Sequence, residues 1–227
     1  MDFNKKLQFW SYLRQHLNQR SSDVYQALKE VTSVYSSHPT APLSFQARVN
    51  SFTEQKFYLL ETQRLVVRVP AMRETVYLLP RENATMLMSA TLPPTSDPYW
   101  QKRYSQKGRF IPEEHYESWK QEIVWVAEKP LTAAEMKELI DIPESTLKPV
   151  LNRLAFEGML LRIGADSFRS NTIRYVSREK WLREVYAVPD AGESLTWLAG
   201  EYRHEIYDIK LCKTASRQFL IKKLCMI

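Results

Sequence analysis

The chain has 227 residues and a net charge of +6, with 44% hydrophobic and 26% charged residues, which is ordinary for a globular protein and argues against disorder. Two cysteines (Cys212 and Cys225), four scattered histidines and five glycines provide no disulfide framework, no metal-ligand spacing and no glycine-rich phosphate loop, so we expect neither a metal nor a cofactor. No apolar run reaches the roughly 20 residues needed to cross a bilayer and no signal peptide is recognisable, so we expect a soluble protein of the cytoplasm.

Residues 1–92 are expected to form a helical unit that ends in a β-hairpin. Apolar residues recur at helical spacing in four segments. A capping cluster at Ser21–Asp23 precedes the second helix, Pro42 opens the third, and Thr53 caps the fourth. Two strand-like segments follow, at 65–69 and 75–79. The same order occurs again later in the chain, which indicates an internal repeat.

Residues 93–112 are the predicted linker between two units. The run Pro93–Pro98 resists regular structure because it holds three prolines. The aromatic and basic stretch Tyr99–Tyr104 follows it. These rings are suited either to stacking on nucleic-acid bases or to packing against a hairpin, and packing is the more common use of such residues.

Residues 113–188 carry the clearest pattern, that of a winged helix-turn-helix. Thr132 and Glu135 have the spacing of a capping box at the start of a short helix. A turn at 141–143 leads to a longer helix from about Ser145, which would place Pro149 in its first turn and end at Gly158. The period then changes to two in the segments 159–163 and 172–176, which predicts a hairpin. The fold class expected for the chain is therefore mainly α with small β-hairpins (α+β), built from tandem winged helix-turn-helix units.

A winged helix predicts contact with duplex DNA, because such modules place their second helix in the major groove. Arginine and lysine side chains on the helix and on the hairpins would contact phosphates. The predicted DNA-binding residues are Arg68 and Arg73 on the first hairpin, Lys148, Asn152 and Arg153 on the helix, and Arg162, Arg169 and Arg174 on the second hairpin. The alternative is a winged helix used for protein contacts, in which these charges are simply solvated.

Residues 189–227 are expected to form an incomplete third unit and a basic tail. Leu195, Leu198, Ala199 and Tyr202 form an apolar stripe, but no winged-helix pattern follows it. The segment 203–227 holds six basic and two acidic residues, so residues 1–202 carry a balance of only +2. Overall charge alone therefore does not identify a DNA-binding protein.

Several segments together resemble a bacterial family of winged-helix proteins, the AlkZ-like DNA glycosylases, over roughly residues 5–202. The segments are VYSSHPTAPL at 34–43, RLVVR at 64–68, MRETVYLLP at 72–80, PLTAAE at 130–135 and SLTWLAGEY at 194–202. The resemblance implies tandem winged helices that cup duplex DNA in a basic channel. It also implies hydrolysis, without a metal, of the N-glycosidic bonds of alkylated or cross-linked bases.

Catalysis in that family rests on two polar side chains, commonly Gln-x-Gln or Gln-x-Asp, that position or activate a water. The motif aligns with Tyr35-Ser36-Ser37, which offers neither a carboxylate nor a carboxamide. Ser37 can orient a water but is a poor base, and His38 is the nearby group that titrates close to neutral pH. A structural role for His38 at a helix edge or in a loop, bonded to backbone, is the interpretation that the sequence favours.

Two hypotheses follow from this departure. The one we favour from the sequence is a DNA-binding member of the family without catalytic activity, because the glutamine motif and a full third unit are both missing. The other is a DNA glycosylase that uses Ser37 and His38. On either hypothesis we expect base excision to be slower than in members with the glutamine motif, because losing one well-aimed polar group costs about 10²–10³ in rate.

Overall fold

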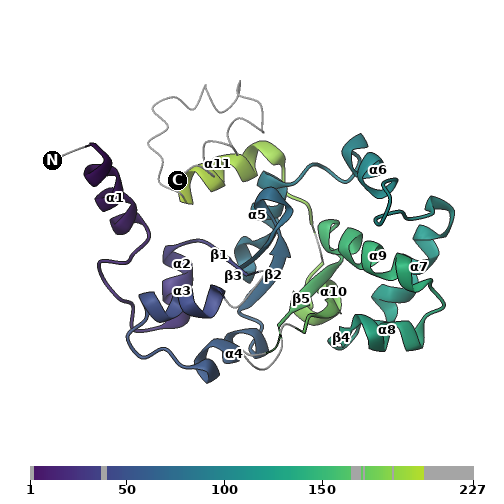
Figure 1. Ribbon diagram of the computed structural model, residues 1–227, viewed down its shortest axis with the longest axis horizontal. Helices are drawn as coiled ribbons and strands as arrows, with labels where there is room; N and C mark the ends of the chain where they lie inside the picture. The colour runs from purple at the N-terminus through teal and green to yellow at the C-terminus, as the bar shows by residue number, and fades with distance from the viewer. Residues whose placement is uncertain (1–2, 37–39, 165–169, 171, 186, 202–227) are drawn as a thin grey trace.

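The computed structural model describes residues 3–36, 40–164, 170, 172–185 and 187–201. It is a helical protein with one small antiparallel sheet at its centre, an α+β fold as expected (Figure 1). Within the described residues, the helices are all too short or too polar to cross a membrane.

The N-terminal part consists of a first helix and a winged-helix unit that ends in helix α5. Its elements are α1 (Phe3–Arg14), α2 (Val24–Glu30), β1 (Val34–Tyr35), α3 (Thr40–Arg48), α4 (Glu54–Thr62), β2 (Val66–Pro70), the 3₁₀ turn η1 (Met72–Glu74), β3 (Val76–Pro80), the 3₁₀ turn η2 (Arg81–Asn83) and α5 (Ala84–Thr91).

The remaining elements begin with a short helix in the predicted linker. They are α6 (Pro98–Tyr104), α7 (Glu113–Val126), β4 (Leu131–Thr132), α8 (Ala133–Leu139), α9 (Glu144–Phe156), β5 (Leu160–Ile163), β6 (Arg174–Ser177), α10 (Arg178–Leu182) and α11 (Ala191–Glu201). The segment from α7 to β6 has the same element order as the segment from α2 to β3. In both, a two-residue strand precedes the helix-turn-helix and pairs with the last strand of the hairpin. The tandem repeat is therefore visible in the sheet as well as in the helices.

The two hairpins join into a single six-stranded sheet in the order β1-β3-β2-β5-β6-β4. The junction is the antiparallel pairing of β2 with β5, where Arg68 lies opposite Arg162. At the outer ends, Tyr35 of β1 lies opposite Tyr77 of β3, and Leu131 of β4 lies opposite Tyr175 of β6. The sheet thus links two units that the sequence presents as separate.

Local hydrogen bonds explain where several helices begin and end. The carboxylate of Asp23 accepts from the backbone N–H of Gln26 at 2.9 Å, and Thr132 and Glu135 form the expected capping box. Gly158 has a φ of +78°, and the N–H of Met159 donates to the carbonyl of Leu154 at 2.9 Å, which is the closure expected of a left-handed helix end.

Two boundaries differ from the expectation. Helix α9 begins at Glu144, and Pro149 lies in its second turn instead of its first. A proline there has no N–H to donate to the carbonyl of Ser145, which is tolerated because Ser145 is exposed to water. The strands of the first hairpin also lie one residue later than expected, so that Pro70 and Pro80 are their last residues.

Two apolar clusters hold the molecule together. The smaller one joins α2, α3 and α4 to one face of the first hairpin, with Phe45, Phe57 and Leu78 at its centre. The larger one extends from the other face of that hairpin through α5, α6, α7 and α9 to the second hairpin. Because α6 packs into this cluster through Trp100 and Tyr104, the stretch 99–104 serves packing.

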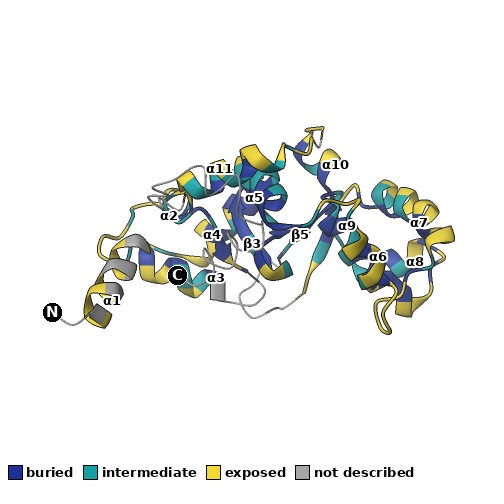
Figure 2. Ribbon diagram, turned by 90° about the horizontal axis from the view of Figure 1, so that it is seen from above, coloured by how far each residue is buried: buried dark blue, intermediate teal, exposed yellow. Residues whose placement is uncertain are grey.

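Helix α11, which the sequence assigns to a third unit, packs against α5. Leu198 is 1% exposed in that contact, and the hydroxyl of Ser89 on α5 donates to the carbonyl of Pro189 at 3.0 Å. Seen from above, α5 and α11 lie on one side of the first hairpin, and α3 lies on the other (Figure 2).

Candidate nucleic-acid interface

The candidate catalytic segment begins on the edge strand β1. Tyr35 is 43% exposed and its ring meets the ring of Tyr77 edge-on, with a centroid distance of 6.0 Å. The N–H of Ser36 donates to the carbonyl of Val76 at 2.8 Å. Ser36 thus lies at the end of β3 that follows the η1 turn. Ser37 and His38 lie outside the described residues.

The η1 turn at this end of the sheet has an unusual backbone. Arg73 and Glu74 have φ values of +53° and +58°, a left-handed conformation that costs non-glycine residues about 1 kcal/mol each. Hydrogen bonds close the turn on both sides, from Ala71 N–H to Thr75 O at 2.9 Å and from the Thr75 hydroxyl to Met72 O at 3.0 Å. Such strain persists only where surrounding contacts fix it, and it gathers at functional sites.

Helix α6 supplies those contacts. The Glu74 carboxylate accepts hydrogen bonds from the hydroxyl of Tyr99 and from the guanidinium of Arg103, with which it also forms an ion pair. The guanidinium of Arg103 lies over the ring of Phe156, at 5.1 Å from its centroid. Arg73, one residue before Glu74, is exposed. Arg73 therefore lies on a backbone turn that the contacts of Glu74 with α6 hold in place.

At the junction of the hairpins, Arg68 and Arg162 have internal partners. Nε of Arg68 lies 2.8 Å from a carboxylate oxygen of Glu61, and both side chains are largely buried. The guanidinium of Arg162 donates to the side-chain oxygen of Asn152, and burial lowers the pKa of Arg162. A side chain at Gly164 would collide with the guanidinium of Arg68, since a Cβ there would lie 2.4 Å from Nη1.

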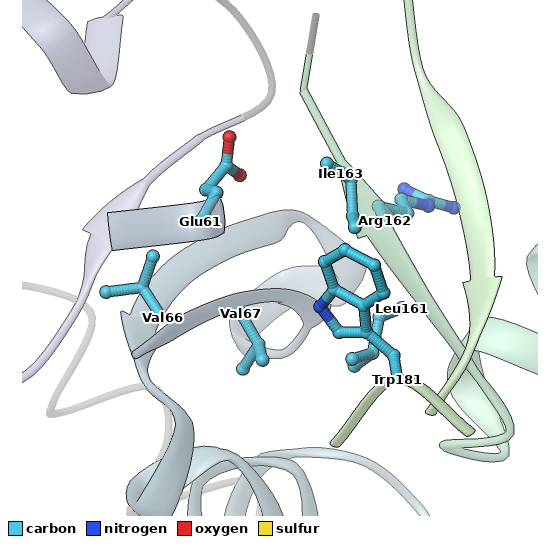
Figure 3. Close-up of a pocket in the computed structure, with 7 residues that line it drawn as sticks. All are labelled: Glu61, Val66, Val67, Leu161, Arg162, Ile163 and Trp181. Carbon is cyan, nitrogen blue, oxygen red and sulfur yellow. The ribbon is translucent and has the colours of Figure 1, made fainter. Parts of the chain in front are cut away.

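A small hollow lies beside this junction (Figure 3). Its lining is apolar apart from Glu61 and Arg162, which stand on opposite sides of it, and Trp181 closes one wall. The guanidinium of Arg64 stacks on the ring of Trp181 at 4.4 Å from its centroid.

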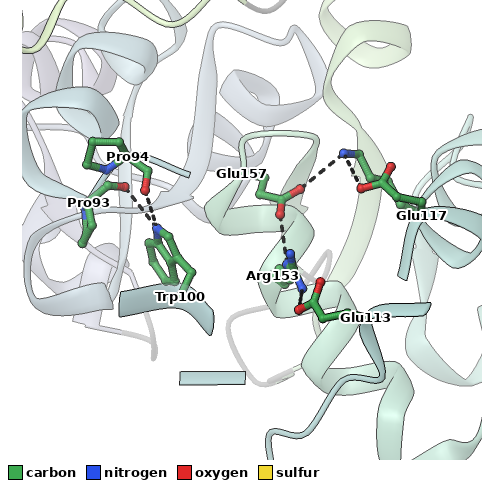
Figure 4. A network of polar contacts seen from close by, with 8 residues as sticks. Pro93, Pro94, Trp100, Glu113, Glu117, Arg153 and Glu157 are labelled. Atoms are coloured by element: carbon green, nitrogen blue, oxygen red, sulfur yellow. Dashed lines mark hydrogen bonds and ion pairs between the residues drawn. The ribbon is translucent and has the colours of Figure 1, made fainter. Parts of the chain in front are cut away.

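On helix α9, Arg153 is part of an internal network. It contacts a carboxylate oxygen of Glu113 at 2.6 Å and one of Glu157 at 3.0 Å (Figure 4). Its guanidinium also lies 3.6 Å from the ring centroid of Tyr116. Glu157 also lies 3.7 Å from the ammonium of Lys120. This network fastens α9 to α7.

The other predicted contact residues are spread over the second unit. Lys148 is exposed on α9, and Arg174 is half-buried on β6 opposite Thr132. Arg169 lies outside the described residues. The structure therefore gathers Arg68, Arg162 and Asn152 at the junction, and it holds Arg73 at the end of the sheet that Ser36 reaches.

Sequence reasoning missed Glu61, Glu74, Tyr99 and Arg103, whose roles come from contacts between distant segments. The one available signal was the MRET run at 72–75, which joins two strands without the glycine or asparagine that a turn with positive φ normally uses. A non-glycine turn of this kind indicates that other residues hold it.

The charge around the second helix-turn-helix is negative. Residues 113–144 contain nine acidic and three basic residues, a balance of −6. Residues 93–112 contain four basic residues and one acidic residue, a balance of +3. The segment around α6, next to the η1 turn, is thus positive, whereas the segment that holds α7 and α8 is negative.

Comparison with known proteins identifies the family. Residues 31–206 match the family described as DNA glycosylase AlkZ-like. The fold is similar to that of the solved Streptomyces sahachiroi DNA glycosylase AlkZ, with a TM-score of 0.63 and 18% identity over 85% of this chain. The match covers 54% of that protein, so the chain spans about half of its length. No protein of curated function matches the chain in sequence. The family match covers most of the 227 residues, both hairpins and the segment after β1, and the chain therefore belongs to the AlkZ-like DNA glycosylase family.

Proposed function

We propose that the chain is a DNA glycosylase that removes alkylated or cross-linked bases from duplex DNA in the cytoplasm, without a metal. The family match over residues 31–206 carries this proposal. The matched range includes Tyr35-Ser36-Ser37, where the resemblance described above places the catalytic motif of the family. This reverses the preference drawn from the sequence alone, where the missing glutamine motif favoured a non-catalytic protein.

Hydrolysis of the N-glycosidic bond of an alkylated base needs few catalytic groups from the protein. A water oxygen attacks C1′ of the sugar, the bond from C1′ to the base nitrogen breaks, and its electron pair leaves with the base. An alkylated purine such as 7-methylguanine carries a positive charge, so it departs as a neutral molecule and needs no acid. The protein has to hold the water, accept its proton and stabilise positive charge on the sugar.

We assign these roles to Ser37 and His38, which follow the edge strand. Ser37 would orient the water through its hydroxyl, and neutral His38 would accept the proton at a ring nitrogen. Neither side chain carries a negative charge toward the sugar. The expected rate is therefore about 10²–10³ below that of family members with the glutamine motif.

DNA would approach the end of the sheet where Ser36 and the η1 turn meet. Arg73 is exposed at that end. Lys102 is also exposed, on α6 between Tyr99 and Arg103, the two residues that bind Glu74. The acidic surface of residues 113–144 would repel phosphates, which argues against insertion of α9 into a major groove. Lys148, Arg169 and Arg174 remain proposed phosphate contacts.

A second candidate function is DNA binding without excision. It is favoured by one observation, the tyrosine and serines at 35–37 where the family has glutamine or aspartate. A gel assay for abasic sites separates the two. Duplex DNA treated with a methylating agent is incubated with the protein and cleaved with alkali. Strand breaks above the no-protein control support the glycosylase, whereas intact strands together with a gel shift support the binding protein.

A further inference from the structure

The linker region exposes two aromatic residues, Tyr99 at 40% and Phe110 at 56%. The hydroxyl of Tyr99 donates to the Glu74 carboxylate, so that ring is held by the η1 turn. Trp100 and Tyr104, in the stretch considered for base stacking, are 6% and 3% exposed and lie in the core. Phe110 is 56% exposed, six residues after Tyr104. It stands at the end of a short turn with the sequence Gln106-Lys107-Gly108-Arg109-Phe110, in which every residue is exposed.

The turn is narrow and projects from a fixed base. The N–H of Arg109 donates to the carbonyl of Gln106 at 3.0 Å, and the N–H of Ile111 donates to the carbonyl of Tyr104 at 3.0 Å. Tyr104 and Ile111 are both buried, so the two ends of the turn are anchored in the core. Gly108 has a φ of +78° and nothing within 4 Å of its missing Cβ, which places the tip in open space.

The base of the turn is rigid because α6 is held on three sides. The indole N–H of Trp100 donates to the carbonyls of Pro93 and Pro94 at 3.2 and 3.0 Å (Figure 4). The Trp100 ring packs on Phe156 with a centroid distance of 5.0 Å. Arg103 holds Glu74 of the η1 turn. Helix α6 has seven residues and is therefore about 10 Å long. Because it binds Glu74 through Arg103 and leads into the turn, it holds the turn at a fixed distance from Arg73.

The charge of the turn indicates the kind of partner that it binds. Lys107 and Arg109 lie three residues and one residue before the exposed ring of Phe110, and the segment 93–112 carries a balance of +3. The more exposed ring of Trp125, at 74%, lies instead in the acidic segment 113–144. Proteins that probe duplexes combine cations on phosphates with an apolar side chain wedged between bases. Of these two exposed rings, Phe110 has the neighbours that DNA requires.

We propose that residues 106–110 form a DNA-probing turn, in which Lys107 and Arg109 bind phosphates and Phe110 stacks against an unpaired or weakly paired base. The proposal rests on DNA being the substrate of the proposed function, and it adds a second contact to the one at Arg73. A stacked ring gains most where bases are already poorly paired, so this contact would favour damaged or mismatched positions.

The test measures binding of the full chain to two labelled duplexes that differ in a single mismatched pair. Phe110→Ala should weaken binding to the mismatched duplex by about tenfold, the size of one stacking contact, and binding to the paired duplex by much less. Phe110→Trp should restore the preference. Trp125→Ala is the matched control, an exposed ring outside the turn, and should leave both affinities unchanged.

The cations are tested through the salt dependence of binding. Replacing Lys107 and Arg109 with alanine should lower the slope of log K against log salt by about 0.9 for each lost phosphate contact. The control replaces the exposed Lys29 and Lys129, which removes the same charge without altering the slope. A 2-aminopurine placed as one base of the mismatched pair should change its fluorescence intensity when the wild type binds, and should not change it when Phe110→Ala binds.

Equal effects of Phe110→Ala on the two duplexes, or equal salt slopes for the variant at Lys107 and Arg109 and the control variant at Lys29 and Lys129, would overturn the probing turn. Failure of the wild type to bind either duplex would overturn it together with the DNA contact of the proposed function. If the variants lose binding as expected but the wild type releases no base, the proposal of the probing turn stands and the proposal of a glycosylase is wrong.

Discussion

Arg68 and Arg162 lie directly opposite each other where β2 of the first hairpin pairs with β5 of the second. Like charges in this position repel, so each needs its own partner. Arg68 has the Glu61 carboxylate, and Arg162 has the side-chain oxygen of Asn152 and the face of Tyr175 at 5.9 Å. The pairing of β2 with β5, which joins the two winged helices, therefore depends on the Glu61 carboxylate, because it neutralises the charge of Arg68.

Removal of the Glu61 carboxylate should destabilise the whole chain. Glu61→Ala leaves the guanidinium of Arg68 buried without its counter-charge and facing Arg162, a change that typically costs about 3–5 kcal/mol. Urea unfolding measures the loss. The double variant Glu61→Leu, Arg68→Met removes both charges and should recover most of it. If the double variant is as unstable as Glu61→Ala, the ion pair is not what stabilises the junction.

The left-handed turn gives a second prediction about stability. Glu74→Ala and Glu74→Gly lose the same contacts with Tyr99 and Arg103, but only alanine has to hold a Cβ at a φ of +58°. Glu74→Gly should therefore be more stable than Glu74→Ala by about 1 kcal/mol. Thermal unfolding of the two variants makes the comparison. Equal stabilities would mean that the backbone at residue 74 relaxes once its side chain is gone.

Alkaline pH should loosen the contact between α2 and η2. Burial and the hydrogen bond from the Tyr25 hydroxyl to Glu82, at 2.8 Å, raise the pKa of Tyr25 to about 12 from its usual 10. The folded state prefers the neutral phenol, so the stability from this group is complete below pH 10 and is lost as the pH rises through 12.

Unfolding experiments from pH 9 to 12 compare the wild type with Tyr25→Phe. The difference in stability between the two should shrink as the pH rises above 10. Tyr12→Phe, a change at an exposed tyrosine on α1, should follow the wild type throughout. A difference that stays constant with pH would show that the hydrogen bond to Glu82 contributes nothing in the neutral form.

Local signals in the sequence predicted the local structure well. The capping box of Thr132 and Glu135, the left-handed Gly158 and the two hairpins depend on residues within a few positions of one another, and the structure contains all of them. The strands β1 and β4 were not predicted, because a two-residue strand has no period to detect.

The contacts of the arginines could not be predicted for a different reason. Glu113 is 40 residues from Arg153, and β2 is separated from β5 by most of the second winged helix. An arginine that binds a phosphate and one that binds a distant glutamate look the same in a sequence. Arg153 and Arg68 fit the pattern of a DNA contact, and the fold gives each of them a carboxylate partner.

Single-turnover release of 7-methylguanine from duplex DNA tests most directly whether this chain breaks N-glycosidic bonds in damaged DNA. With protein in excess over substrate, the wild type should release the base faster than the uncatalysed reaction, and His38→Ala should lose that release. Binding of the same duplex by both proteins shows that the loss lies in the chemical step. No release by the wild type, together with a gain of release in Ser37→Gln, would contradict the proposed function and identify a protein that binds DNA without excising bases.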